Sequence, residues 1–326
     1  MAEYQRRARK WDSQEQDTRT TQIYRLKRIA IEMNSDAAEV VEHLLTTSRA
    51  SNTIKTYQRA LEDFKRWQDQ GPETRKQDIF DSATIYLASK SRTVSSRSLA
   101  TFISALAFSR MGRREDEKME WFILDEIVRS KKRMEVAKPQ SFATSEQWMQ
   151  LLQVTDELQW PIWRSDRAKI LLTFLFCALM RISETVGVRF TDITEEGENW
   201  KIEIPKSKSD QERHGAAIFL TRQPWFDETL KRMEARRNSI YVLAAANGGK
   251  WSANAASSEI RRMCEAAQIS GLSPHSFRRG GAMRALDEGV EQQAVQRRGR
   301  WANPKSMTPY IRHSLASQGG PATLIA

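Results

Sequence analysis

A histidine, several arginines, a tryptophan and a tyrosine lie close together in the last quarter of this 326-residue chain. Arg278 follows His275 by three residues in the run HSFRRGGA, and Tyr310 follows Trp301 by nine in GRWANPKSMTPYIR. Arginine binds a phosphate through two parallel hydrogen bonds, and a tyrosine oxygen can act as a nucleophile that forms a covalent intermediate. These residue types allow a phosphate to be held between cations and attacked by Tyr310.

The local pattern around His275 also favours an anion. Ser273 as an N-cap and Pro274 at the first helical position predict that a helix begins there. Such a helix places His275 in its first turn, where free N–H groups and the helix dipole favour negative charge, with Arg278 on the same face. Residues 297–312 contain five Lys or Arg and no Asp or Glu, so the phenolate of the tyrosine among them is favoured.

Each of these residues, taken alone, also has an ordinary structural interpretation. A His-x-x-Arg pair is typical of an exposed basic helix, and Trp301 and Tyr310 are typical of packing residues. Upstream, Arg181 in ALMRISE is expected at the end of an apolar helix, where an arginine commonly binds backbone carbonyls. Lys208 in KSKSD is expected in a solvated hairpin tip. The sequence order of all these residues has to decide between the two interpretations.

The charge of the chain points to a polyanionic partner. There are 52 Lys and Arg against 41 Asp and Glu, for a net charge of +11, which favours nucleic acid first and an anionic membrane second. No apolar run reaches the ~20 residues that a membrane-spanning helix needs. The N-terminus lacks an apolar signal core, and the two cysteines form no disulfide framework, so an intracellular location is expected. Neither metal-ligand spacing nor a glycine-rich phosphate loop is present, so no metal or nucleotide cofactor is predicted.

Hydrophobic periodicity predicts two domains after a flexible segment at residues 1–20. Residues 21–138 are expected to form a helical domain, and residues 139–326 a helical domain with a small antiparallel sheet and a C-terminal tail. The basic stretch 129–142 is predicted to link them. In the first domain, helices are expected at about 21–45, from an N-cap at Ser51 or Asn52 to Gly71, and at about 76–90, 94–110 and 119–135.

In the second domain, the strand signals are WKIEIPKS and GAAIFLT, with KSKSDQERHG between them as a hairpin tip. Gly280 and Gly281 inside a predicted helix cost about 1 kcal/mol each relative to Ala, which predicts the close approach of another backbone. Helices are expected at about 144–154, 165–180, 223–239, 254–268, 274–288 and 291–298.

The order Arg…Lys…His-x-x-Arg…Trp…Tyr resembles that of the tyrosine recombinase (phage-type integrase) family, most closely its Cre-like members. ALMRISE resembles the first-arginine box of that family, HSFRRGGA its His-x-x-Arg box, and GRWANPKSMTPYIR its Trp-to-Tyr segment. TIKTYQRALEDFKRW resembles part of its helical core-binding domain, so the resemblance covers about residues 50–315. It implies a mainly α, two-domain clamp, with a helical core-binding domain and an α-rich catalytic domain that carries a small antiparallel β-sheet.

The resemblance also implies a role for each matching residue. Arg181 and Arg278 would clamp the scissile phosphate. His275 and Trp301 would hold and stabilise it or assist proton movement, although the family often has His where Trp301 stands. Glu184, three residues after the first arginine, would support the site without reacting with DNA.

Two further roles concern bond formation and proton transfer. Tyr310 would be the nucleophile that forms a covalent 3′-phosphotyrosine. Lys208 would be the general acid toward the leaving 5′-hydroxyl, and Lys206 competes with it for this role. Because the phosphotyrosine keeps the bond energy, religation would need neither ATP nor a metal.

The function implied is that of a site-specific DNA recombinase. Its partners would be double-stranded DNA with a specific target site and three further copies of the chain, as a tetramer on two sites. The protein would be DNA-associated inside the cell, and ATLIA at the C-terminus would either dock into a neighbouring copy or fray. Two alternatives are DNA relaxation like that of a type IB topoisomerase, and a non-catalytic DNA-binding protein with the same fold.

Overall fold

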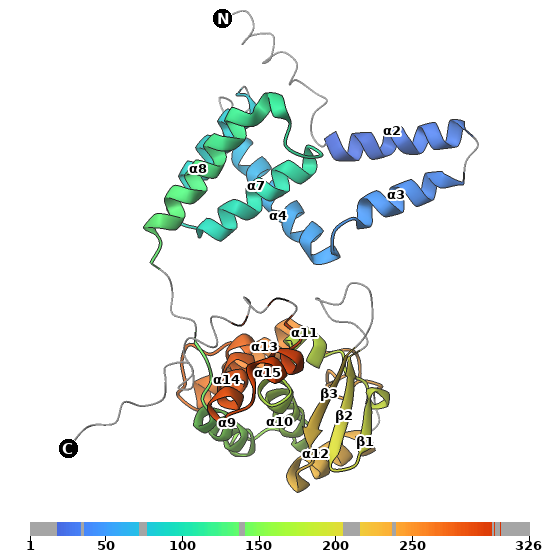
Figure 1. Ribbon diagram of the computed structural model, residues 1–326, viewed down its shortest axis with the longest axis vertical. Helices are drawn as coiled ribbons and strands as arrows, with labels where there is room; N and C mark the ends of the chain where they lie inside the picture. The colour runs from blue at the N-terminus through green and yellow to red at the C-terminus, as the bar shows by residue number, and fades with distance from the viewer. Residues whose placement is uncertain are drawn as a thin grey trace, which may run out of the picture. The chain divides into compact units, whose positions relative to one another are not determined.

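Helices dominate the computed structural model, which describes residues 18–33, 36–71, 77–136, 141–204, 216–236, 239–301, 303 and 307 (Figure 1). The strands among these residues form one three-stranded sheet. This is the predicted fold class, mainly α with a small antiparallel sheet, and it is confirmed. The chain divides into an N-terminal unit, residues 1–138, and a C-terminal unit, residues 139–326.

The N-terminal unit is built from helices around a small aromatic core. Phe64, Tyr86 and Phe102 are buried, and each pair of their rings has centroids 4.9–5.1 Å apart in tilted or edge-on contact. The elements are α2 (Thr18–Glu32), α3 (Ala37–Thr47), α4 (Ser51–Gln68), α6 (Ile79–Lys90), α7 (Ser96–Ser109), the 3-10 turn η1 (Glu115–Glu117) and α8 (Lys118–Met134).

Two expectations for the start of this unit are wrong. The single helix expected over residues 21–45 is two helices, α2 and α3, and the run Asn34-Ser35-Asp36 falls between them. Asp36 is the N-cap of α3, and short polar residues of this kind favour helix starts over helix interiors. Helix α4 begins at Ser51, so its N-cap is Ala50, whose side chain makes no capping bond, and neither Ser51 nor Asn52 is the cap.

The C-terminal unit packs its helices around α10, which is buried along most of its length. Thr144 is the N-cap of α9, because its Oγ1 accepts from the Gln147 backbone N–H at 3.2 Å. The helices are α9 (Ser145–Glu157), α10 (Ile162–Phe176), α11 (Ile182–Thr185), α12 (Pro224–Arg236), α13 (Ala253–Ala266), α14 (Pro274–Asp287) and α15 (Gln292–Gly299), with a 3-10 turn η2 (Phe190–Asp192).

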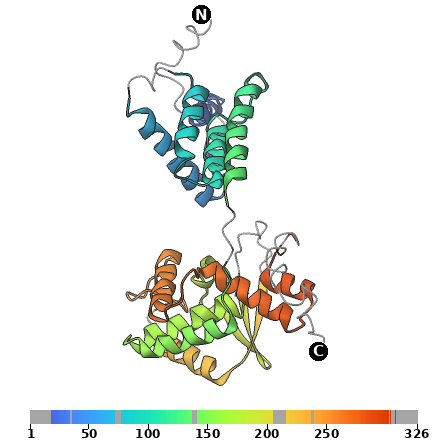
Figure 2. The same cartoon turned by 90° about the vertical axis from the view of Figure 1, so that its left-hand side faces the viewer.

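The sheet of this unit has the order β1-β2-β3, and both strand pairs are antiparallel (Figures 1 and 2). Strands β2 (Asn199–Ile204) and β3 (Ala216–Thr221) are the two that were expected. Strand β1 (Ile193–Glu196) was not, because its sequence ITEE has a single apolar residue. Ile202 of β2 faces Ile218 of β3, and both are buried in the core. The predicted hairpin tip lies outside the described residues.

Helix α10 ends at Phe176, four residues before the predicted end. Leu179 has φ 50°, a left-handed conformation that no helix accepts, so the chain turns here before α11 begins. Arg181 is therefore the N-cap of α11 and does not end the apolar helix as expected. The turn brings the carbonyl of Phe176 against α14, where a β-carbon on Gly281 would be 1.8 Å from that oxygen.

Gly280, the other glycine of this pair, lies against the backbone of the segment that carries Ala143. A β-carbon on Gly280 would be 1.8 Å from the carbonyl oxygen of Ala143. The same segment donates from Ala143 N to Ser276 O at 3.0 Å, and Ser141 shares a hydrogen bond of 2.8 Å with the Ser276 hydroxyl. The prediction that the two glycines mark a close backbone approach is confirmed, and α14 is held from both sides.

None of the described helices is both long and apolar enough to cross a membrane.

Candidate active site

Glu184 is a buried carboxylate that holds Arg181 in two ways. Its Oε2 accepts from the Arg181 backbone N–H at 2.8 Å, and its Oε1 accepts from Arg181 Nη1 at 2.6 Å. Burial pushes the pKa of Glu184 upward, but the charge of Arg300 and the bonds from Arg181 outweigh it, so the pKa is lowered. Glu184 is thus ionised and fixes a guanidinium whose side chain keeps 22% of its surface exposed.

Arg278 of α14 lies deep in the unit, with 1% of its surface exposed. Its Nη1 donates to the Leu179 carbonyl at 2.5 Å and its Nη2 donates to the Gly299 carbonyl. The guanidinium also stacks on Trp301, with its Cζ 4.5 Å from the ring centroid. The residue is therefore fixed in position by the loop after α10, by the end of α15 and by an indole face.

Trp301 follows α15 and is 8% exposed. Its ring covers Gly299, where a β-carbon would be 1.8 Å from the ring atom Cζ3, so no side chain fits at that position. Trp301 packs with Leu179 and with apolar residues of α14 and α15. Trp301 is therefore a core residue whose ring face lies against the Arg278 guanidinium.

His275 is exposed in the first turn of α14, and Ser273 and Pro274 begin the helix as predicted. Its pKa is lowered to about 4, first by partial desolvation and then by the charges of Arg279, Arg278 and Arg181. The imidazole is therefore neutral near pH 7, with one nitrogen that donates and one that accepts. It is suited to relaying a proton beside an anion.

Arg300 belongs to this group, although its role was not expected. Its Nη2 donates to Glu184 Oε2 at 2.7 Å and to the Leu179 carbonyl at 3.4 Å, and its Nη1 donates to the Arg298 carbonyl at 2.9 Å. The residue caps α15 in the left-handed region, with φ 53°, where a non-glycine residue costs roughly 1–2 kcal/mol. The sequence showed it only as one cation of a basic segment.

The structure brings five of the seven predicted site residues into one group. We call Arg181, Glu184, His275, Arg278 and Trp301, together with Arg300, the arginine cluster. The other two, Lys208 and Tyr310, lie outside the described residues, as does Lys206. Within the described part of the chain, no group of His, Cys, Asp and Glu side chains has the arrangement of a metal site.

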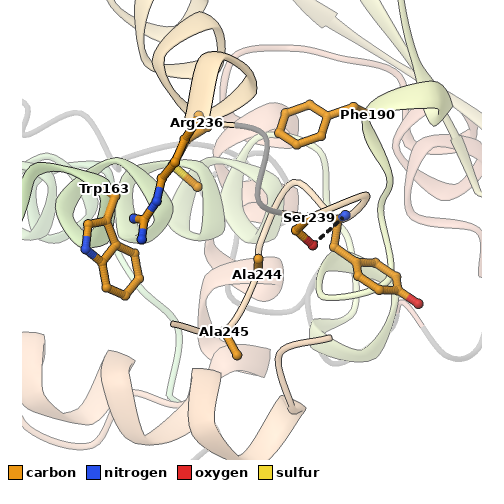
Figure 3. Close-up of a pocket in the computed structure, with 8 residues that line it drawn as sticks. Trp163, Phe190, Arg236, Ser239, Ala244 and Ala245 are labelled. Atoms are coloured by element: carbon orange, nitrogen blue, oxygen red, sulfur yellow. Dashed lines mark hydrogen bonds between the residues drawn. The ribbon is translucent and has the colours of Figure 1, made fainter. Parts of the chain in front are cut away.

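A small cavity elsewhere in the unit does not compete with this cluster. It lies between Trp163, Phe190, Arg236 and the loop that carries Ala244, with the Arg236 guanidinium 4.3 Å from the Trp163 ring (Figure 3). Its volume of about 10 Å³ leaves room for about one water molecule at most. It has no lining residue in common with the arginine cluster.

The surroundings of the two cysteines disfavour the thiolate form of each. Cys177 caps α10 and Cys264 is buried in α13, and both thiols are free. Burial raises the pKa of each to about 11. Neither residue takes part in the cluster.

Comparison with known structures supports the same fold over nearly the whole chain. A lambda integrase dimer bound to a COC′ core site has 14% identity and a TM-score of 0.60, covering 94% of this chain and 79% of that one. The XerH site-specific recombinase, in a post-cleavage complex with a palindromic difH substrate, has 13% identity and a TM-score of 0.60, with 93% and 95% covered. A lambda integrase tetramer bound to a Holliday junction has 14% identity and a TM-score of 0.58, with 85% and 75% covered.

No curated protein sequence matches the chain significantly. The family model described as "Phage integrase family" matches residues 141–316, which is more than half of the chain and includes the whole arginine cluster. That match, the fold and the placement of Arg181, His275 and Arg278 in one cluster agree with one another. The chain belongs to the phage integrase family.

Proposed function

We propose that this protein is a site-specific DNA recombinase that cuts and rejoins DNA through a 3′-phosphotyrosine at Tyr310. The observation that carries the proposal is the pair Arg181 and Arg278, each fixed by other protein groups beside a neutral His275. Fixed donors stabilise a phosphorane-like transition state without reorganising, and each such donor is worth about 10²–10³ in rate. The net charge of +11 favours a polyanionic substrate.

The reaction proposed is a transesterification that balances without a further reactant. The Tyr310 oxygen attacks the scissile phosphorus, a tyrosyl P–O bond forms, and the bond from phosphorus to the 5′-oxygen breaks. The phenol proton passes to His275 or to water, and Lys208 gives a proton to the leaving 5′-oxygen. A 5′-hydroxyl from a partner duplex then attacks the phosphotyrosine, which restores the phosphodiester and frees Tyr310.

Arg278 must serve this reaction from a buried position. Two of its N–H groups donate to the carbonyls of Leu179 and Gly299, so the guanidinium is already oriented before a phosphate arrives. Its positive charge then attracts the phosphate without a rearrangement of the side chain. Arg181 is the more exposed of the two and is proposed to make the first phosphate contact. Arginine suits both positions because its guanidinium stays protonated at any working pH.

The proposed partners are double-stranded DNA with a specific site and further copies of the chain, four on two sites. Support comes from the DNA-bound relatives, among them the tetramer on a Holliday junction. Binding is expected to weaken steeply with salt, with a log–log slope of about −0.9 for each phosphate neutralised.

The test is capture of the covalent adduct on DNA of unknown preference. The probe is a pool of nicked duplexes with randomised sequence around the nick. Attack beside the nick releases a short strand, so religation is blocked and the adduct accumulates. Denatured complexes are isolated, the attached DNA is sequenced, and mass spectrometry locates the nucleotide on the peptide. We expect it on Tyr310, and the selected duplex then serves all later assays.

Tyr310→Phe is the matched control, because it removes only the attacking oxygen. It is expected to bind the selected duplex like the wild type and to form no adduct. An adduct that persists in this variant, or none in the wild type, would overturn the proposal. Paired sites on one plasmid then separate recombination from the relaxation expected of a topoisomerase-like enzyme, since only a recombinase yields exchanged products.

A further inference from the structure

We propose that Arg300 is a positioning residue that balances the charge of Glu184, so that the charge of Arg181 remains available to the scissile phosphate. The inference rests on the proposed function of the arginine cluster and adds a residue to it. Arg300 does not itself touch the phosphate in this proposal. It acts through the carboxylate that both arginines share.

The geometry shows how the carboxylate is divided. Glu184 Oε1 accepts from Arg181 Nη1 at 2.6 Å, and Glu184 Oε2 accepts from Arg300 Nη2 at 2.7 Å. The Glu184 side chain is 3% exposed and that of Arg300 is 10% exposed, so solvent screens their attraction weakly. Two cations on one anion leave a net charge of +1.

The difference in exposure between the two arginines decides which of them presents this net positive charge to solvent. Arg181 has 22% of its side-chain surface exposed against 10% for Arg300, so the excess charge is presented to solvent through Arg181. Without Arg300, Glu184 and Arg181 would form a neutral pair. A neutral pair attracts an incoming phosphate, and stabilises its transition state, less than a cation does.

Arg300 also joins the two halves of the proposed phosphate clamp. The Leu179 carbonyl accepts from Arg300 Nη2 and from Arg278 Nη1, so one oxygen serves both guanidiniums. Through Glu184 the same Arg300 reaches Arg181. The end of α15, immediately before Trp301, is thereby tied to the loop that carries Arg181.

The backbone indicates that the side chain is there for a reason other than helix termination. Arg300 has φ 53° and ψ 44°, the conformation in which glycine is the favoured residue after a helix. A guanidinium placed there at a conformational cost, and turned inward onto Glu184, fits a function in the cluster. Arg297 and Arg298 on the last turn of α15 are exposed and show no such arrangement.

The variants follow from this geometry. Arg300→Gly removes the guanidinium and suits the left-handed backbone, so the fold should tolerate it. Arg300→Lys keeps the positive charge, and Arg300→Met keeps the length without the charge. Arg284→Ala is the matched control, because Arg284 is an exposed guanidinium of α14 paired with Glu288, six residues along the helix from Arg278 and so on another face.

The first measurement is the single-turnover rate of adduct formation on the selected duplex at saturating protein. We expect Arg300→Gly and Arg300→Met to lose at least about tenfold, because loss of one transition-state interaction of ~1.4 kcal/mol is a factor of ten. Arg300→Lys should recover most of the rate and Arg284→Ala should match the wild type. Rates for Gly and Met close to the wild type, or equal rates for Lys and Met, would overturn the proposal.

The second measurement asks whether Arg300 acts through Glu184. In a double-mutant cycle, Arg300→Gly should have little further effect in a Glu184→Gln background, because the charge it balances is gone. Equal losses in both backgrounds would contradict the proposal.

A third measurement needs no cleavage and so separates this inference from the proposed function. The Glu184 carboxyl is titrated by carbon-13 NMR in DNA-free protein, with Glu184→Gln to assign the signal. The titration should move to higher pH in Arg300→Gly, since the charges acting on this carboxyl are those of Arg300 and Arg181. No movement would overturn the inference, whereas a wild type without adduct would overturn only the proposed function.

Discussion

Arg278 Nη1 donates to the carbonyl oxygen of Leu179 at 2.5 Å, which joins the middle of α14 to the turn after α10. Leu179 presents that oxygen because its φ of 50° reverses the chain before Arg181. Leu179 thus orients Arg278 through its carbonyl oxygen. Its left-handed backbone also reverses the chain and so places Arg181 at the start of α11. The phosphate clamp that we propose depends on this single reversal.

The first prediction concerns the planar fork of Arg278. Arg278→Lys keeps the charge but loses the planar guanidinium that donates to Leu179 and Gly299 while it lies over Trp301. We expect adduct formation to fall by about 10²–10³, as for loss of one oriented oxyanion donor, while DNA binding changes little. Single-turnover rates and equilibrium binding on the selected duplex measure the two quantities. Cleavage near the wild-type rate would remove Arg278 from the clamp.

The second prediction concerns the packing of α14 on α10. Gly281→Ala should destabilise the protein by about 1–3 kcal/mol, because the new methyl group meets the Phe176 carbonyl and overpacks the contact. This outweighs the gain of about 1 kcal/mol that alanine normally brings to a helix. Thermal and urea unfolding followed by circular dichroism give the change. Gly187→Ala is the comparison, since its nearest clash is 3.3 Å from Glu184 O, and it should cost less. Equal costs would contradict this account.

The third prediction concerns the protonation of His275. Proton NMR of the DNA-free protein should show its imidazole titrating at about pH 4, with His275→Gln used to assign the signal. Arg279→Gln removes the largest of the charges that lower this pKa, so the titration should move toward 6.5. An unmoved titration would remove Arg279 as a cause.

The same shift has a consequence for stability. Because the folded-state pKa of His275 lies below the unfolded value, the unfolded chain binds more protons between pH 6.5 and about 4. This residue's contribution is therefore constant above pH 6.5 and falls as the pH drops through that window. His275→Gln should flatten the fall in unfolding free energy over the same range.

The fourth prediction separates Lys208 from Lys206. A duplex with sulfur in place of the bridging 5′-oxygen has a leaving group that needs no proton. Lys208→Ala should cleave the normal duplex slowly and the sulfur-substituted duplex at close to the wild-type rate, because only its acid role is lost. Lys206→Ala is the matched control and should not show this rescue. The reverse pattern would assign the acid role to Lys206.

The sequence predicted the elements of the C-terminal unit well where apolar periodicity and caps agree. The start of α9 near residue 144, the start of α14 at Ser273 and Pro274, and the close approach at Gly280 and Gly281 are all confirmed. Helix α10 was predicted too long, because the apolar run continues to Met180 while the chain already reverses at Leu179. Neither the composition nor the spacing of apolar residues predicts that a leucine adopts a left-handed backbone conformation.

The candidate site was predictable for a different reason. Its residues stand in an order that identifies a family, and the family match confirms that identification. The Cre-like placement within the family, the domain roles and the residue roles stay predictions. Arg300 could not be found, since its function depends on a left-handed backbone that turns its side chain onto Glu184. In sequence it is one cation among several.

The raised pKa of both cysteine thiols gives the chain a practical property. With a pKa of about 11, roughly one thiol in ten thousand is ionised at pH 7, and the thiolate is the form that reacts with maleimides. Both thiols are therefore expected to react slowly with maleimides in the native protein. A single cysteine introduced on the exposed surface of either unit would then be the preferred site for attaching a fluorophore.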